Sequence, residues 1–152
     1  MELVGSIFNG SGEPGDFGWM LRQPDYGDAL FIFNDNEEEF LAHQAHAPGS
    51  QKCHPGGGNA IIRPYQCQLP QRATGIPTGS HGVGYDQLDN HVRRVIDEAV
   101  GVVASLLASG QFRRVIYSAS NESGDLGTGI FRVRPEVRAY IIEGLRRVVA
   151  NG

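Results

Sequence analysis

The sequence predicts an α/β protein, a three-layer α/β/α sandwich built on a mixed, mostly parallel central sheet. The first observation is the continuous apolar run 29–33, which is short and rich in aromatic and β-branched residues, as in strands buried on both faces. The second is the order of strand, long helix and strand over 73–119, which implies a parallel crossover. At 152 residues, 40% of them apolar, the chain is expected to form one domain, 1–152.

The elements of the first half follow from local signals. The apolar stretches 3–8 and 17–21 predict two strands, which are expected to pair as a hairpin at one edge of the sheet. The buried strand is followed by three glutamates, and acidic residues in a first turn favour a helix. Asp35 or Asn36 is the expected N-cap of that helix.

The second half alternates strands with helices. Residues 60–65 form an apolar run, in which Pro64 indicates a sheet edge or a strand end. Residues 73–78 predict the central strand, and Asp86 is the expected N-cap of the long helix that follows.

Two stretches carry apolar residues at helical spacing, 88–107 and 137–149, and each predicts a helix that packs on the sheet. Residues 112–119 predict a strand between them. The segment 130–133 is expected to be a short strand or an extended stretch, and Pro135 suits a first helical position.

Glycine-rich loops supply the main functional signal. The stretch 79–85 contains three glycines, which permit positive φ and expose N–H groups that can bind an anion near a helix start. It is neither a GxGxxG motif nor a Walker loop. This loop and the glycine-rich loop 120–129 follow parallel strands, so both are expected at one sheet edge, where α/β proteins bind ligands. The glycines of 56–58 permit close approach to a ligand or form a plain turn.

The stretch 76–85, Ile-Pro-Thr-Gly-Ser-His-Gly-Val-Gly-Tyr, resembles the loop P-x-x-S/T-G-x-x-G-x of the macrodomain family. The run 56–60, Gly-Gly-Gly-Asn-Ala, is similar to that family's earlier glycine run, and 118–129 to its last loop. The resemblance covers roughly 28–149. The family's Asn-Ala-Ala-Asn stretch is absent, and 34–36 is at best its analogue. The resemblance implies a macro-like α/β/α sandwich that binds ADP-ribose or a related nucleotide derivative, with the first two loops flanking the diphosphate.

The expected partner is therefore a nucleotide-derived small molecule such as ADP-ribose. The expected ligand-binding residues are Asn34, Asn36, Gly57, Gly58, Asn59, Thr78, Gly79, Ser80, Gly82, Val83, Gly84, Tyr85, Ser120, Asn121 and Gly127. If the same cleft hydrolyses ADP-ribosyl or nucleotide-derived substrates, the candidate catalytic acids and bases are Asp35, His81 and Asp125. The sequence leaves open a binding module, such a hydrolase, and a structural or protein-interaction domain.

Charge and hydropathy argue against two other classes of partner. A formal net charge of −4 argues against nucleic acid as the main partner. No signal-peptide pattern opens the sequence, and the longest apolar run, 99–108, is too short to span a bilayer, so no membrane partner is expected. A cytoplasmic location is predicted, in which Cys53 and Cys67 are reduced thiols. Nothing in the sequence sets the oligomeric state.

The loop 44–58 is rich in proline, glycine and histidine and is expected to form a flap over the site. In and beside it lie four residues of metal-binding types whose spacing matches no zinc signature, namely His43, His46, Cys53 and His54. Neither a metal site nor a cofactor is therefore predicted.

Overall fold

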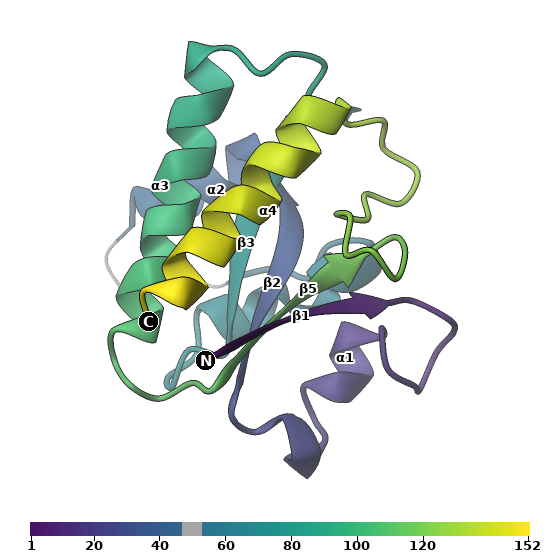
Figure 1. Cartoon of the computed structure of the whole chain (residues 1–152), viewed down its shortest axis with the longest axis vertical. Helices are drawn as coiled ribbons and strands as arrows, with labels where there is room; N and C mark the ends of the chain where they lie inside the picture. The colour runs from purple at the N-terminus through teal and green to yellow at the C-terminus, as the bar shows by residue number, and fades with distance from the viewer. Residues whose placement is uncertain (47–52) are drawn as a thin grey trace.

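The computed structural model describes residues 1–46 and 53–152. Within them, one sheet is formed by β1 (Glu2–Ile7), β2 (Ala29–Asn36), β3 (Ala73–Ser80), β4 (Val83–Gly84) and β5 (Arg114–Ala119). The strand order is β1-β5-β2-β3-β4. The first four strands in this order run parallel, and β4 is antiparallel to β3 (Figure 1). The predicted α/β class with a mixed, mostly parallel sheet is confirmed.

Helices cover both faces of the sheet. On one face α3 (Asn90–Leu107) and α4 (Pro135–Ala150) lie side by side (Figure 1), and Phe40 of α2 (Glu37–Gln44) joins their apolar core. On the other face lie α1 (Phe17–Met20) and the 3₁₀ helix η2 (Gly58–Gln66), while the short 3₁₀ helix η1 (Pro24–Tyr26) precedes β2.

Strand β2 lies at the centre of this packing. Leu30 and Ile32 belong to the core under α3 and α4, whereas Phe31 and Phe33 belong to the core under α1 and η2. The prediction that 29–33 is buried on both faces is therefore confirmed. Burial of each large side chain contributes roughly 1.5–3 kcal/mol to the stability of the fold. The helices on both faces of the sheet therefore depend on β2 for their packing.

The predicted strand at 17–21 is wrong, because residues 17–20 form the short helix α1 and Leu21 is its C-cap. The carboxylate of Asp16 accepts a hydrogen bond of 3.3 Å from the amide of Trp19 and caps that turn. Strand β1 pairs with β5 instead of forming a hairpin. The cap that Asp16 provides directly before this short apolar run favours a helix over a strand.

The run 60–65 lies in η2 and not at a sheet edge. Ile62 is buried while Ile61 is half exposed, so one side of the helix faces the core. The apolar run was too short for periodicity to separate helix from strand.

The N-cap of α3 is Asp89, whose side chain accepts a hydrogen bond of 2.9 Å from the amide of Val92. Asp86 was the wrong candidate, because a hairpin and an extended segment separate β3 from α3.

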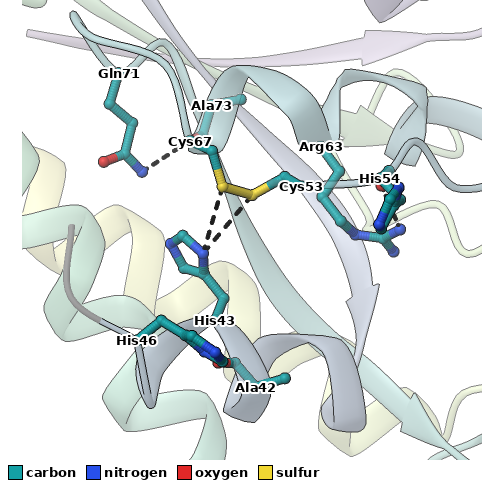
Figure 2. The surroundings of a disulfide bond; sticks show 9 residues. All are labelled: Ala42, His43, His46, Cys53, His54, Arg63, Cys67, Gln71 and Ala73. Carbon is teal, nitrogen blue, oxygen red and sulfur yellow. Dashed lines mark hydrogen bonds between the residues drawn. A yellow bond between two sulfur atoms is a disulfide. The ribbon is translucent and has the colours of Figure 1, made fainter. Parts of the chain in front are cut away.

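The two cysteines form a disulfide, Cys53–Cys67, so the prediction of reduced thiols is wrong (Figure 2). It joins the segment before η2 to the residue that ends η2. A sequence separation of 14 residues does not by itself indicate a disulfide, because the two cysteines meet only once η2 has formed between them.

Residues 47–52 of the predicted flap lie outside the described part of the chain. Among the described helices, none has the length and apolar composition that crossing a membrane requires.

Candidate functional site

The parallel strands β1, β5, β2 and β3 end at the same edge of the sheet, which we call the carboxyl edge. Both predicted glycine-rich loops begin there, since β3 ends at Ser80 and β5 ends at Ala119. Strand β2 lies between these two strands. The ends of the strands therefore bring several predicted residues to one edge, but in two separate groups.

Asn59 ties the first group together. Its Nδ2 donates hydrogen bonds of 2.9 Å to Ser118 Oγ and 3.1 Å to the carbonyl of Gly15. Its Oδ1 accepts a hydrogen bond of 3.0 Å from the amide of Phe17. One amide side chain thus fixes the start of η2 against β5 and against the turn before α1.

Asn34 extends this group across the sheet. Its Nδ2 donates a hydrogen bond of 2.6 Å to the carbonyl of Gly127, whose own amide donates to the carbonyl of Ser118 at 2.9 Å. The structure therefore brings together three predicted residues, Asn34, Asn59 and Gly127, around the end of β5.

The glycine run 56–58 lies beside them. Gly57 and Gly58 are exposed, and a Cβ added at either would meet no atom within 4 Å. Gly57 is the N-cap of η2, and no side chain caps this helix start. Neither glycine amide donates a hydrogen bond to another described residue. These two N–H groups are therefore open to an external acceptor.

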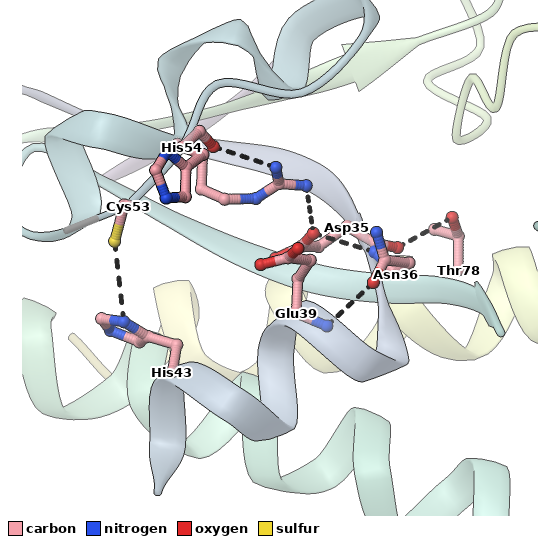
Figure 3. Close-up of polar contacts among 8 residues, drawn as sticks. Asp35, Asn36, Glu39, His43, Cys53, His54 and Thr78 are labelled. Carbon is pink, nitrogen blue, oxygen red and sulfur yellow. Dashed lines mark hydrogen bonds and ion pairs between the residues drawn. The ribbon is translucent and has the colours of Figure 1, made fainter. Parts of the chain in front are cut away.

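Asp35 forms a buried ion pair at the end of β2 (Figure 3). Arg63 Nη2 donates a hydrogen bond of 2.7 Å to Asp35 Oδ1, and Nη1 donates to the carbonyl of His54 at 3.0 Å. Burial raises the pKa of the Asp35 carboxyl above its usual 3.8, although contact with Arg63 opposes that rise. Gly56 packs on the guanidinium, since an added Cβ would lie 2.8 Å from Nη1. This carboxylate is buried, and its Oδ1 accepts hydrogen bonds from Arg63 and from the amide of Asn36.

Asn36 and Thr78 also make local contacts. The side chain of Asn36 caps α2 through the amide of Glu39 at 2.8 Å, which confirms the predicted helix start. Thr78 Oγ1 lies 3.5 Å from the carbonyl of Asp35, at the limit of a hydrogen bond.

The stretch 79–85 is a β-hairpin and not a loop before a helix. His81 and Gly82 have φ of 53° and 76°, and they connect the paired residues Ser80 and Val83. Two central residues with positive φ form the type I′ turn that hairpins favour. The predicted phosphate loop at this place is therefore wrong in its backbone geometry, because the glycine spacing serves the turn.

A carboxylate of the chain itself already accepts hydrogen bonds from the polar groups of this turn. Glu38 of α2 accepts hydrogen bonds of 2.6 Å from Ser80 Oγ and 2.8 Å from the amide of His81. These hydrogen bonds lower the pKa of Glu38. The turn is thus complementary to an anion, but the chain supplies that anion itself.

The remaining hairpin residues serve close packing. A Cβ on Gly79 would overlap the carbonyl oxygen of Val83, and one on Gly84 would overlap that of Arg132. Tyr85 is buried, and its hydroxyl donates a hydrogen bond of 2.8 Å to Glu37 Oε1. Burial and this bond raise the pKa of Tyr85 far above its usual range.

In the loop after β5, the predicted polar residues contact one another. Asn121 Nδ2 donates a hydrogen bond of 2.9 Å to Asp125 Oδ2, and the amide of Ser120 donates one of 2.8 Å to the carbonyl of Asp125. Among the contacts of the described residues, no hydrogen bond or ion pair joins any two of Asp35, His81 and Asp125. The structure does not bring the three candidate catalytic residues together, and their roles stay predictions.

Two surface hollows flank these loops. One of about 380 Å³ is lined by 86–89 with Arg134 and Glu136. One of about 530 Å³ lies between β1, Tyr117, the segment 121–124 and Arg146. Neither is lined by both glycine-rich loops. The segment after the second loop contacts the residue that follows β4, since the amide of Arg134 donates a hydrogen bond of 2.9 Å to the carbonyl of Tyr85.

Sequence reasoning missed two residues that shape this edge. Arg63 interrupts the apolar run 60–65, and a lone charge in such a run signals a buried partner. For Glu38 the sequence indicates only a favourable charge in a first helical turn, and not the contact with the hairpin.

Comparison of the chain with protein-family models, with curated proteins and with solved structures finds no match.

Proposed function

We propose that this protein binds a small phosphate-bearing ligand of the nucleotide or ADP-ribose class at the carboxyl edge of the sheet. The observation that carries the proposal is the uncapped start of η2, where the amides of Gly57 and Gly58 have no acceptor among the described residues. Backbone N–H groups at a helix start are complementary to phosphate oxygens. The absence of side chains at both positions lets a ligand approach the backbone closely.

Polar groups beside these amides suit the rest of such a ligand. Asn34 uses its Nδ2 on Gly127, and its Oδ1 receives no hydrogen bond from a described residue. An amide oxygen of this kind accepts hydrogen bonds from ribose hydroxyls. Asn59 and Ser118 hold the start of η2 against β5 and so keep the spacing between the amides and Asn34 constant.

The macrodomain resemblance supports the same ligand class. It implies that the glycine run 56–60 and the stretch 76–85 flank the diphosphate, and that the last loop, 118–129, lies near the distal ribose or base of the same ligand. In this chain Asn59 of the glycine run contacts Ser118 of the last loop at 2.9 Å. The hairpin 79–85, the third part of the resemblance, is excluded from the proposal because Glu38 occupies its amide and hydroxyl donors. The proposal concerns binding and assigns no turnover.

A pair of substitutions at Gly57 tests the role of its amide. Gly57 has φ of −76°, which proline adopts, so Gly57→Pro deletes the N–H with little change of backbone. Gly57→Ala retains the N–H and adds a Cβ into the same open space. Calorimetric titration with ADP-ribose, ADP, AMP and inorganic phosphate is expected to show binding to the wild type and to Gly57→Ala. Gly57→Pro is expected to bind about tenfold more weakly, because a hydrogen bond to a charged acceptor contributes about 1.5 kcal/mol.

Three outcomes oppose the proposal. Absence of heat with the whole panel removes the ligand class. Equal affinity of Gly57→Pro and Gly57→Ala removes the amide from the site. A loss of affinity confined to Arg146→Gln transfers the ligand to the hollow of about 530 Å³ beside α4, which Arg146 lines.

A further inference from the structure

A cluster of three metal-ligating side chains lies away from the proposed ligand site. His43 Nδ1 lies 3.7 Å from Cys53 Sγ and 3.9 Å from Cys67 Sγ (Figure 2). The ligand atoms of all three residues lie within 4.8 Å of one another, and each side chain is partly buried. The residues come from the last turn of α2, from the segment before η2 and from the end of η2, so the fold and not the local sequence assembles them.

The spacing from the imidazole to the sulfurs matches that of a tetrahedral zinc ion. Zinc binds thiolate sulfur at about 2.3 Å and imidazole nitrogen at about 2.0 Å. Tetrahedral angles then separate nitrogen from each sulfur by about 3.6 Å and the sulfurs from each other by about 3.8 Å. His43 is already placed within a few tenths of an ångström of that arrangement. The sulfurs alone have to separate, which requires that the disulfide be reduced.

We propose that in the reduced protein His43, Cys53 and Cys67 bind one zinc ion or another thiophilic divalent cation. The two sulfurs would then alternate between a disulfide and a metal dithiolate. Among the described residues no fourth histidine, cysteine or carboxylate joins the group. A tetrahedral ion would complete its coordination with water, as zinc does at sites with three protein ligands.

Reduction of the disulfide precedes binding of the metal ion. A dithiol reductant transfers two electrons and two protons to the Cys53–Cys67 bond, which gives two thiols, and the reductant becomes a cyclic disulfide. The divalent cation then displaces one proton from each thiol and forms two metal–sulfur bonds. Imidazole contributes the Nδ1 lone pair of its neutral form. A two-electron oxidant that takes both thiolates back to the disulfide releases the cation.

Cobalt(II) is the probe for this site, because its thiolate complexes absorb light. The full chain is reduced anaerobically with a water-soluble phosphine, which becomes a phosphine oxide with an oxygen atom from water, and is then titrated with Co²⁺ alone. We expect one Co²⁺ per chain, with a thiolate-to-cobalt charge-transfer band and the visible bands of a tetrahedral ion. Zinc is expected to displace the cobalt, and the oxidised protein is expected to show no such bands.

His43→Ala and His46→Ala form a matched pair on one helix end. His46 directs its Nδ1 to the carbonyl of Ala42 at 2.6 Å and is not part of the cluster. We expect His43→Ala to weaken binding more than about tenfold, since even the loss of an outer-sphere partner costs 10–100-fold. His46→Ala is expected to bind as the wild type does, and Cys67→Ser to lose most of the charge-transfer intensity.

Far-UV circular dichroism of each reduced variant verifies that the chain remains folded. Absence of the charge-transfer band in the reduced, folded wild type overturns the proposal. So does equal cobalt affinity in His43→Ala and His46→Ala. If the reduced chain unfolds without metal, zinc must restore the native helix signal in the wild type and fail to do so in Cys67→Ser, and any other result rejects the site.

Discussion

Arg63 Nη2 donates a hydrogen bond of 2.7 Å to Asp35 Oδ1, and the two side chains are only 10% and 1% exposed. The pair joins η2 to the end of β2, and the Arg63 guanidinium packs against Gly56, just before the exposed glycines at the start of η2. Arg63 also lies over the ring of Phe33, 5.9 Å from its centroid. The buried carboxylate thus holds the arginine, whose guanidinium also contacts the carbonyl of His54.

Removing one member of this pair is expected to destabilise the fold strongly. Arg63→Met keeps most of the side-chain volume but leaves the Asp35 carboxyl buried without its partner. Loss of one partner of a buried ion pair costs about 3–5 kcal/mol. Urea unfolding of Arg63→Met measures this loss. The double variant Asp35→Leu with Arg63→Met is expected to recover much of it. A loss below about 1 kcal/mol in Arg63→Met would show that the pair contributes no more than a surface one.

The contact of Glu38 with the hairpin is expected to give a pH-dependent term in stability. Hydrogen bonds from Ser80 and from the amide of His81 lower the pKa of Glu38 in the folded chain below its usual 4.5. The stabilisation is therefore fully present above pH 4.5 and is lost as pH falls through the lowered folded-state pKa. The difference in unfolding free energy between the wild type and Glu38→Gln should shrink over that range. Because Glu38 is exposed, the difference at neutral pH should not exceed about 1 kcal/mol.

The hairpin turn is expected to matter for stability and not for ligand binding. Gly82 has φ of +76°, and a Cβ there would meet no atom within 4 Å. Gly82→Ala should therefore cost about 1 kcal/mol, which is the cost of a left-handed residue with a side chain. The affinity for the phosphate-bearing panel should not change, because the proposed site is at Gly57 and Gly58. A drop in affinity with unchanged stability would restore the hairpin as the ligand site.

The parts of the fold that the sequence predicted are those with a repeated signal. The apolar run 29–33, buried on both faces, and the apolar stripes of the two long helices each repeat the requirement for burial over many residues. One exception in such a pattern therefore does not change the predicted element. The start of α2 was also predictable, because Asn36 and the glutamates after it act locally. The hairpin was not predicted, because the glycine spacing does not indicate that His81, a residue with a side chain, adopts positive φ.

The site depended on contacts between distant segments. The pairs Asp35–Arg63, Asn59–Ser118 and Cys53–Cys67 each require a fold that has already formed. Asn34 and Asn59 were predicted as ligand-binding residues from their positions at a strand end and after a glycine run. Their mutual arrangement around β5 follows only from the strand order β1-β5-β2, which no local pattern encodes.

The two polar side-chain atoms of Asn59 have opposite roles, since Oδ1 accepts one hydrogen bond and Nδ2 donates two. Asn59→Asp retains the size of the side chain and the acceptor for the amide of Phe17, but it loses the donor to Gly15 and Ser118. A carboxylate oxygen would then face the carbonyl of Gly15, and the fold is expected to lose about 2–3 kcal/mol. Ser118→Ala removes only one of the two acceptors and should cost about 1 kcal/mol. Thermal and urea unfolding compare the two variants. Equal losses would mean that the hydrogen bond from Asn59 to the carbonyl of Gly15 contributes no measurable stability, and that Asn59 holds η2 through Ser118 alone.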